Sequence, residues 1–221
     1  MTDSLSALID AIDQADSPVR LMTAVRALAD ARLEEGIPAL IQALGYNNPG
    51  AAVMAVNGLV QLGEVAVQPL LEQLDGYNYG ARAYAIRALA AIADPRALES
   101  LLDAAVNDFA PSVRRAAIKG IGSLHWQLLA EDDRAIAQTR VLETLLLVSS
   151  DPDWANRYAA VVGLQALAVA LAKTTIDTSH VSQLSTRLAA LAQTDPDPAT
   201  KARACMAQQH LRQLSQPLLV A

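Results

Sequence analysis

One type of helical segment recurs along the chain, and this repetition limits the fold more than any other feature of the sequence. Five segments carry small and apolar residues at helical spacing after a turn rich in Pro, Gly, Asn or Asp: residues 18–31, 49–63, 80–94, 111–124 and 155–171. Their aligned apolar positions are Leu28, Leu59, Leu89, Ile121 and Leu164, at steps of 31, 30, 32 and 43 residues. A near-constant period of this length is typical of helical repeat proteins.

A second apolar segment follows each of the first, at residues 37–44, 67–74, 97–106, 140–149 and 181–192. Two helices in every repeat of about 30 to 40 residues are the pattern of HEAT-type proteins. We therefore predict an all-α fold, a right-handed α-solenoid of about five to six HEAT-like helix pairs that forms a single domain over residues 1–221. The longer fourth step indicates an insertion around residues 126–137, which we expect to lengthen the first helix of its pair or to form a loop.

The composition agrees with helices and excludes several classes of protein. Ala accounts for 44 of the 221 residues and Leu for 33, and both enter helices at little cost. Charged residues make up 18%, below the usual value of about 25%, so we expect apolar surface to contact a partner. The net charge of -6 argues against nucleic-acid binding, which needs a basic surface. The uncharged stretch of residues 158–172 is too short to span a membrane.

Motifs for catalysis by the chain's own side chains do not occur in the sequence. There is no G-x-G-x-x-G, P-loop, H-E-x-x-H, C-x-x-C or G-x-S-x-G pattern. The three histidines are far apart, so we expect no metal site. The single cysteine, Cys205, fits a reducing compartment such as the cytoplasm, and we interpret it as a small buried thiol.

The few aromatic residues indicate a binding site. Five of the eight lie in turns that precede first helices: Tyr46, Tyr77, Tyr79, Phe109 and Trp154. Stacked repeats place equivalent turns along one edge, where exposed rings favour ligand binding. The alternative is that the rings cap the layer between repeats. The run Tyr77-Asn78-Tyr79 is the strongest candidate, and Tyr158 follows in the first turn of a helix.

Arginine positions divide into two groups. Three arginines lie seven residues before an anchor: Arg82, Arg114 and Arg157. Because a cation opposes the dipole of a helix N-terminus, we interpret this register first as a structural ladder with nearby aspartates, namely Asp75, Asp108, Asp151 or Asp153. Arg87 and Arg115 fall outside the register and have no structural role in the pattern, so they are better candidates for binding an anion. Asp108, next to Phe109, is the candidate functional carboxylate.

Two runs of this sequence carry a resemblance to a known family. They are residues 77–82 (YNYGAR) and residues 108–115 (DFAPSVRR). With the residues between them and as far as Trp126, these runs resemble the phycobilin lyases of the heterodimeric E/F type. The repeat pattern extends the likeness along most of the chain, and the short length resembles the smaller F (beta) subunit of the phycocyanin alpha-subunit lyases.

The resemblance implies a cytoplasmic cyanobacterial protein that pairs with a larger E-type lyase subunit. Together they would attach phycocyanobilin by a thioether bond to a cysteine of the phycocyanin alpha subunit, with phycocyanobilin as bound substrate and no prosthetic group. For this chemistry, and because they lie in the matching runs, we expect Asp108 and Tyr79 to act in catalysis. The residues that we expect to bind the bilin are Tyr77, Asn78, Arg87, Arg114, Arg115, Trp154 and Tyr158.

Two other functions stay open at this point. In the first, the chain is a chaperone-like subunit that holds the phycobiliprotein or the E-type chain, and the bilin site lies wholly on the partner. In the second, it detaches bilins or helps to disassemble phycobilisomes. Mixing the chain with bilin and acceptor protein, with and without the E-type partner, distinguishes these functions from a lyase.

Overall fold

A computed structural model describes residues 2–74, 78–172 and 178–215, and the side chains of all of these except residues 2, 3, 79, 178, 214 and 215. The described residues form helices and turns without a β-strand, which confirms the predicted all-α repeat fold. Contacts group the chain into two units, Met1–Ser100 and Leu101–Ala221, and each is described here by itself. The single solenoid over residues 1–221 stays a prediction.

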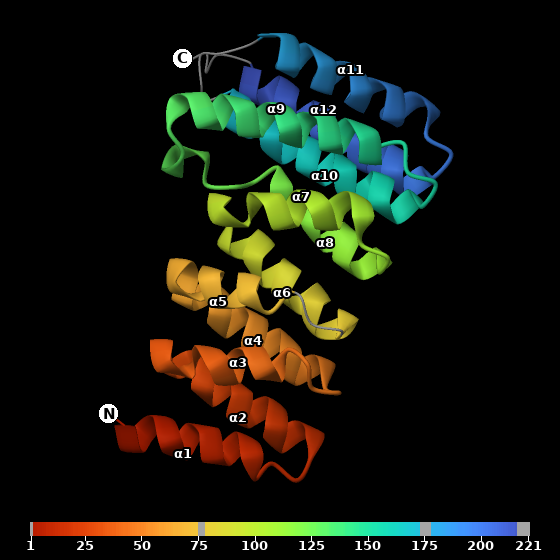
Figure 1. Cartoon of the computed structure of the whole chain (residues 1–221). Coiled ribbons are helices and arrows are strands. Elements are labelled where there is room, and N and C mark those ends of the chain that lie inside the picture. The colour runs from red at the N-terminus through yellow and green to blue at the C-terminus, as the bar shows by residue number, and fades with distance from the viewer. Residues whose placement is uncertain (1, 75–77, 173–177, 216–221) are drawn as a thin grey trace, which may run out of the picture. The chain divides into compact units, whose positions relative to one another are not determined.

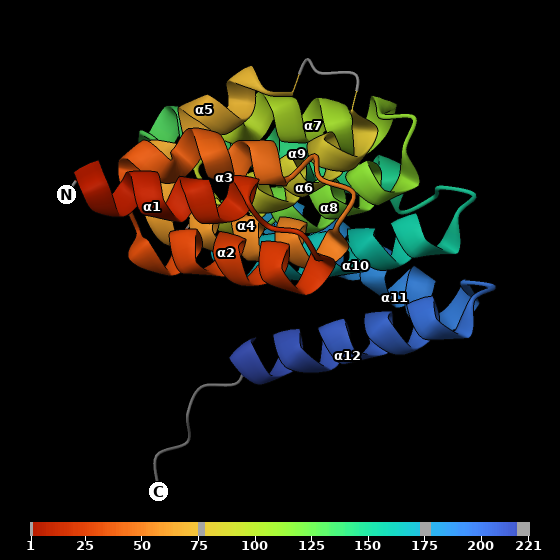
Figure 2. The same ribbon diagram turned by 90° about the horizontal axis from the view of Figure 1, so that it is seen from below.

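Unit 1 is built from paired helices joined by short 3₁₀ turns. Its helices are α1 (Thr2–Asp13), α2 (Pro18–Ala31), α3 (Ile37–Ala43), α4 (Pro49–Leu62), α5 (Val67–Glu72), α6 (Tyr79–Ile92) and the start of α7 (Leu98–Asn107). Its 3₁₀ turns are η1 (Glu34–Gly36), η2 (Gly63–Ala66) and η3 (Pro95–Ala97). Figures 1 and 2 show α2, α4 and α6 following one another in one layer, with α3 and α5 in the other. This is the predicted stack of helix pairs.

Unit 2 has the same two-layer arrangement with longer helices. It contains the rest of α7, then α8 (Pro111–Ile121), η4 (Trp126–Leu128), α9 (Glu131–Val148), α10 (Trp154–Leu171), α11 (Thr178–Thr194) and α12 (Pro198–Ser215). Helix α10 lies between α8 and α12 and contacts both, while α9 and α11 pack against each other and against α10. The face of α10 that turns away from α9 and α11 is therefore bordered by α8 and α12.

The predicted anchor residues form the core of the units. Leu28, Leu59, Leu89, Ile121 and Leu164 are at most 1% exposed. The second helices contribute equally buried leucines, Leu40, Leu70, Leu101, Leu145 and Leu188. Burial of one Leu side chain stabilises the folded state by about 1.5–3 kcal/mol, so the recurring apolar positions supply much of the stability of each repeat.

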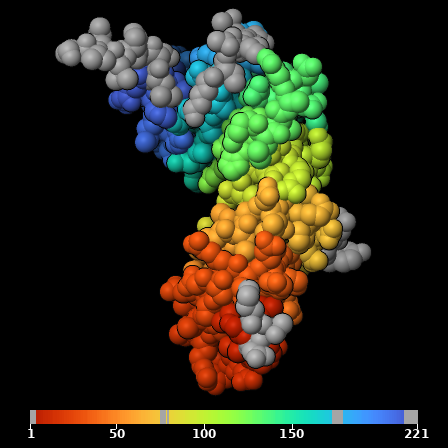
Figure 3. Space-filling model, turned by 90° about the vertical axis from the view of Figure 1, so that its left-hand side faces the viewer, coloured from red at the N-terminus to blue at the C-terminus, as the bar shows by residue number. Residues whose placement is uncertain are grey.

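The insertion around residues 126–137 takes a form that the sequence did not predict. It consists of η4 and the first turns of α9, so it lengthens the second helix of its pair. Glu131, Asp132 and Asp133 occupy the first turn of α9, where acidic side chains stabilise the positive end of the helix dipole. Leu128 and Ile136 are each 61% exposed, and this green segment lies on the surface of unit 2 in Figure 3.

One segment of the described chain, Pro49–Glu72, is long and apolar enough by length and composition to cross a membrane. In the structure it is interrupted at Gly63, whose φ of 70° lies in the region that favours glycine. The segment therefore forms two helices, α4 and α5, joined by η2. Ala51, Ala52 and Leu70 are fully buried in unit 1, so the apolar character of this segment reflects the core of a repeat.

Cys205 differs from the prediction. Its side chain lies on the exposed side of α12, whereas Ala204 and Ala207 take the buried positions. The prediction of a buried thiol is therefore wrong. The periodicity of α12 explains the difference, because Cys205 is one position away from the apolar face.

Candidate functional site

A pocket of about 680 Å³ lies within unit 2, along the face of α10 that α8 and α12 border. We call it the α10 pocket. Its lining comprises the turn after α8 (residues 122–127), Arg134 of α9, Arg203 of α12, and Val162, Gln165, Ala166, Val169 and Ala170 of α10. The volume is within the range of about 300–1,000 Å³ that small-molecule sites occupy.

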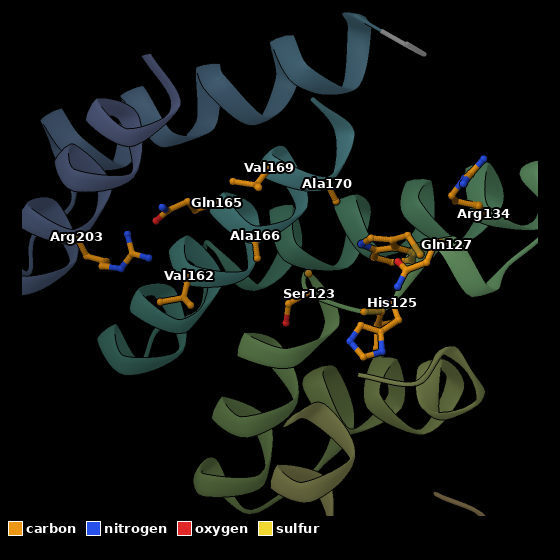
Figure 4. Close-up of a pocket in the computed structure, with 13 residues that line it drawn as sticks. Ser123, His125, Gln127, Arg134, Val162, Gln165, Ala166, Val169, Ala170 and Arg203 are labelled. Atoms are coloured by element: carbon orange, nitrogen blue, oxygen red, sulfur yellow. The ribbon is translucent and has the colours of Figure 1, made fainter. Parts of the chain in front are cut away.

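The floor of the α10 pocket is a regular helix face. Val162, Gln165 and Val169 are three and four residues apart, so they lie on one side of α10. Figure 4 shows Val162, Ala166 and Val169 following one another along the helix. Towards the N-terminus the same spacing continues to Tyr158 and Trp154, so these two rings lie on the same helix face as the pocket floor.

Two glycines shape one wall of the pocket. A Cβ atom on Gly122, directly after α8, would collide with the backbone carbonyl of Gly163 in α10. A Cβ on Gly163 would come within 2.6 Å of the carbonyl oxygen of Ile118. The end of α8 therefore approaches α10 more closely than a larger residue allows, and the turn that carries His125 and Trp126 begins beside the floor.

Arginines mark both ends of the α10 pocket. In Figure 4, Arg203 lies at one end and Arg134 at the other, with Ser123 and Ala166 between them. Both side chains are half-buried, and neither has an ion pair or a side-chain hydrogen bond with a described residue. None of the described residues that line the pocket is acidic. The pocket is therefore cationic in a chain whose net charge is -6.

Two polar atoms at the pocket are buried and have no hydrogen-bond partner among the described residues. One is Nε1 of Trp126, whose residue is 6% exposed, and the other is Oε1 of Gln165. The amide nitrogen of Gln165 is already paired with Nδ1 of His210, so only its oxygen is unsatisfied. Unsatisfied buried polar atoms are rare in native proteins. A ligand with both a hydrogen-bond donor and an acceptor would satisfy them.

The structure describes the predicted site residues of unit 1 only in part. Tyr77 lies outside the described residues; Tyr79 begins α6, and its side chain is outside them too. Asn78 caps α6, because its Oδ1 accepts from the N–H of Ala81 at 3.0 Å. Its amide also donates to the carbonyl of Gly45 at 3.5 Å. Arg87 is exposed on α6 and forms no ion pair with a described residue.

Asn78 has a structural counterpart one repeat earlier. Asn48 caps α4 by accepting from the N–H of Ala51 at 3.1 Å, and its amide donates to the carbonyl of Pro18 at 2.9 Å. Both asparagines thus cap a helix and join it to the preceding repeat. This repetition gives Asn78 a structural function that the sequence analysis missed, and its predicted contact with a bilin stays a prediction.

Several predicted residues of unit 2 lie where α8 and α10 begin. Trp154 is 49% exposed at the start of α10, and Tyr158 is half-buried one turn later. Arg115 of α8 forms an ion pair with Asp153, directly before Trp154, at 3.7 Å. The inference that Arg115 has no structural partner is therefore wrong, because α8 and α10 are neighbours and bring the two charges together.

Asp108 and Arg114 complete the predicted set. Asp108 is half-buried, and its carboxylate accepts a hydrogen bond from the N–H of Ala110 at 2.8 Å, which orders the turn before α8. Arg114 is half-buried, and its Nε is buried without a partner. None of the predicted site residues whose side chains the structure describes lines the α10 pocket. Their predicted roles stay predictions.

The predicted arginine ladder occurs at Arg157, but with a different acid. Arg157 donates to both carboxylate oxygens of Asp195 at 2.8 and 2.9 Å, and its Nη1 donates to the carbonyl of Asp151 at 3.0 Å. The hydrogen bond from Arg157 lowers the pKa of Asp195, and the same bond raises the pKa of Arg157. Asp195 is in the turn between α11 and α12, so the arginine reaches forward to the next repeat.

The comparisons with known proteins agree with this architecture. Residues 5–76 and 67–165 match the family of HEAT repeats. The chain is 52% identical over 219 residues to a phycocyanobilin lyase subunit beta of Pseudanabaena tenuis, covering 99% of this chain and 77% of the relative. It is also 52% identical over 202 residues to a phycocyanobilin lyase subunit beta of a Nostoc species, covering 91% of this chain and 97% of the relative.

A solved structure shares the fold at high sequence identity. It is the complex of CpcE and CpcF of phycocyanin lyase from a Nostoc species, with 55% identity and a TM-score of 0.72 over 79% of this chain and 98% of that chain. Fold and repeats place the molecule among the HEAT-repeat proteins. Within that class, the chain belongs to the family of phycocyanobilin lyase beta subunits.

Proposed function

We propose that this chain is the beta subunit of a heterodimeric bilin lyase that attaches phycocyanobilin to a cysteine of the phycocyanin alpha subunit. The observation that carries the proposal is the similarity over nearly the whole chain to lyase beta subunits. Relatives of cyanobacterial origin support a place in the cyanobacterial cytoplasm. The CpcF chain in the matched structure is in complex with CpcE, which supports an E-type subunit as the partner of this chain.

The chemistry of the reaction suits a protein that binds and orients its substrates. The acceptor thiol adds across the ethylidene double bond of the bilin A-ring. A carbon–sulfur bond forms and the neighbouring carbon gains a proton, so the step has no leaving group and needs no oxidant. The nucleophile belongs to the acceptor protein, and correct placement of bilin and thiol can supply much of the rate enhancement.

Among the residues predicted from the sequence, Trp154 and Tyr158 have the position that best supports bilin binding. Their rings lie one turn apart on one face of α10, and Trp154 is 49% exposed. Flat aromatic rings are suited to stack on the pyrrole rings of the bilin. Asp108 lies in the turn before α8, where a carboxylate can stabilise a protonated bilin, and this role is part of the proposal.

Reconstitution tests the proposed function. Purified chain, E-type partner or both are mixed with phycocyanobilin and the apo alpha subunit of phycocyanin, and covalent bilin is measured on denaturing gels and by absorbance. We expect the thioether product only when both subunits are present. Product formation by the partner alone would assign a chaperone-like role to this chain. Loss of bilin from finished holo-protein would assign a detaching function, and either result overturns the proposal.

A further inference from the structure

The geometry points to the α10 pocket as the site that binds the two propionates of the bilin, with Arg134 and Arg203 as their partners. This inference rests on the proposed function and deepens it by assigning the substrate's carboxylates to named residues. The sequence predicted anion binding at Arg87 and Arg115, so the inference assigns the carboxylate contacts to different residues.

Charge is the first argument for an anionic ligand. Arg134 and Arg203 are half-buried and have no ion pair with a described residue, and no described acidic residue lines the pocket between them. A partly buried cation without a partner costs free energy, which a bound carboxylate can offset. Arginine can bind a carboxylate with two parallel hydrogen bonds, which fixes its orientation as well as its position.

The arrangement of the two arginines favours a ligand with two carboxylates. They occupy opposite ends of the pocket, and the floor between them is formed largely by Val162, Ala166 and Val169. Phycocyanobilin is an open-chain tetrapyrrole whose two propionates extend from an otherwise largely apolar conjugated system. Because both propionates extend from the two central pyrrole rings, these rings would lie on the apolar floor with one propionate directed towards each arginine.

Unsatisfied polar atoms supply independent evidence for a bound molecule. Oε1 of Gln165 is an acceptor and Nε1 of Trp126 is a donor, and both are buried at the pocket without a partner. A bilin offers pyrrole N–H donors and lactam carbonyl acceptors. A bilin therefore offers groups that match the two missing hydrogen bonds in kind, and it can reach the buried atoms of Gln165 and Trp126 once these side chains turn towards the pocket.

The helix face of α10 connects the pocket with the predicted aromatic residues. Trp154 and Val162 are eight residues apart, about 12 Å along a helix that rises 1.5 Å per residue. Tyr158 lies between them on the same face. A bilin held by its propionates in the pocket thus has rings within reach towards the start of α10, where Trp154 is 49% exposed.

The test measures how strongly the heterodimer distinguishes free phycocyanobilin from its dimethyl ester, which lacks both carboxylate charges. Dissociation constants are obtained from absorbance titrations of the wild type, Arg134→Gln, Arg203→Gln and the double variant, each with the E-type partner. We expect the wild type to bind the free acid about 100-fold more tightly than the ester, with about 10-fold lost in each single variant. The double variant should bind both molecules equally.

Arg212→Gln is the matched control, because Arg212 is an exposed arginine of the same helix as Arg203 and does not line the pocket. It should keep the full preference for the free acid. Circular dichroism and co-elution with the E-type partner show whether each variant folds and assembles. A double variant that assembles and keeps the wild-type preference overturns the inference, as does loss of the preference in Arg115→Gln instead.

Three further outcomes distinguish failure of this inference from failure of the proposed function. If the wild-type pair attaches bilin to the alpha subunit while the double variant binds the free acid normally, the pocket assignment fails and the lyase function stands. If the wild-type pair attaches no bilin, the proposed function itself fails. If the double variant loses the E-type partner but still prefers the free acid, the pocket is part of the subunit interface, and the inference is overturned.

Discussion

Unit 2 holds arginines in two contrasting environments. At the start of α10, the side chain of Arg157 is 11% exposed and donates two hydrogen bonds to Asp195, whose side chain is 1% exposed. At the α10 pocket, Arg134 and Arg203 are half-buried beside apolar residues and have no ion pair with a described residue. Arginine is thus paired with a carboxylate inside the fold at the start of α10, whereas at the α10 pocket it has no ion pair with a described residue.

This difference separates a structural cation from one that is available to a ligand. Arg157 joins two successive turns of unit 2, and Arg187 makes a similar connection by donating to the carbonyl of Ser149 at 2.8 Å. The pocket arginines make no such connection among the described residues. We therefore expect substitutions of the two kinds of arginine to separate stability from bilin binding.

The largest loss of stability is expected from Arg157→Ala. Removal of one partner leaves the buried carboxylate of Asp195 unpaired, and breaking a buried pair typically costs about 3–5 kcal/mol. We expect the free energy of unfolding to fall by an amount of this order, measured by urea denaturation. Arg212→Ala removes an exposed arginine and should change it by less than about 0.5 kcal/mol. Equal free energies of unfolding for the two variants would show that the Arg157–Asp195 pair does not stabilise the packing of successive repeats.

Lowering the pH should reduce the difference in the free energy of unfolding between the wild type and Arg157→Ala. Hydrogen bonding to Arg157 holds the pKa of Asp195 below its ordinary value, so the unfolded chain binds a proton more readily than the folded protein does. The contribution of the pair is complete above the unfolded carboxyl pKa of about 4 and is lost as the pH falls through the folded-state pKa. Urea titrations between neutral and acidic pH measure this. If the difference in the free energy of unfolding between the wild type and Arg157→Ala stays constant down to acidic pH, the Arg157–Asp195 pair is not its source.

A smaller loss of stability is expected from Gly122→Ala. The added Cβ would collide with the backbone carbonyl of Gly163, and forcing extra atoms into a close-packed contact typically costs about 1–3 kcal/mol. Gly80→Ala is the control, because among the described residues a Cβ there would have only Oδ1 of Asn78 nearby, at 3.3 Å. We expect thermal unfolding to show a lower midpoint for Gly122→Ala alone. Equal midpoints would mean that α8 and α10 can separate without cost.

The repeats and the core follow from the sequence because they depend on local periodicity. Leu59 and Leu89 are buried as predicted, since each helix presents one apolar face and small residues allow close packing. The described helices also begin within a few residues of the predicted positions, except at the insertion before α9. There, the acidic run 131–133 is a helix-start signal within the insertion that was predicted to form a loop or to lengthen the first helix of its pair.

The α10 pocket could not be predicted in the same way. Its polar residues come from α9, α10, α12 and the turn after α8, and they share no register in the repeats. Arg203 and Gln165 are separated by 38 positions and meet only because α10 and α12 are neighbours. Trp126 ends the stretch that resembles the lyases, but its burial and its unsatisfied Nε1 become apparent only in the structure.

The smallest effect on stability, and the sharpest contrast with Arg157, is expected from Arg203→Gln. The half-buried guanidinium has no ion pair with a described residue, so its removal breaks no internal contact of that kind and relieves part of the cost of burying a charge. We expect the free energy of unfolding to stay within about 0.5 kcal/mol of the wild type, or to rise slightly, while bilin binding weakens. Urea denaturation of both variants in one series measures this. A loss comparable to that of Arg157→Ala would make Arg203 a structural residue, because an arginine available to a ligand contributes to binding and not to the stability of the unliganded fold.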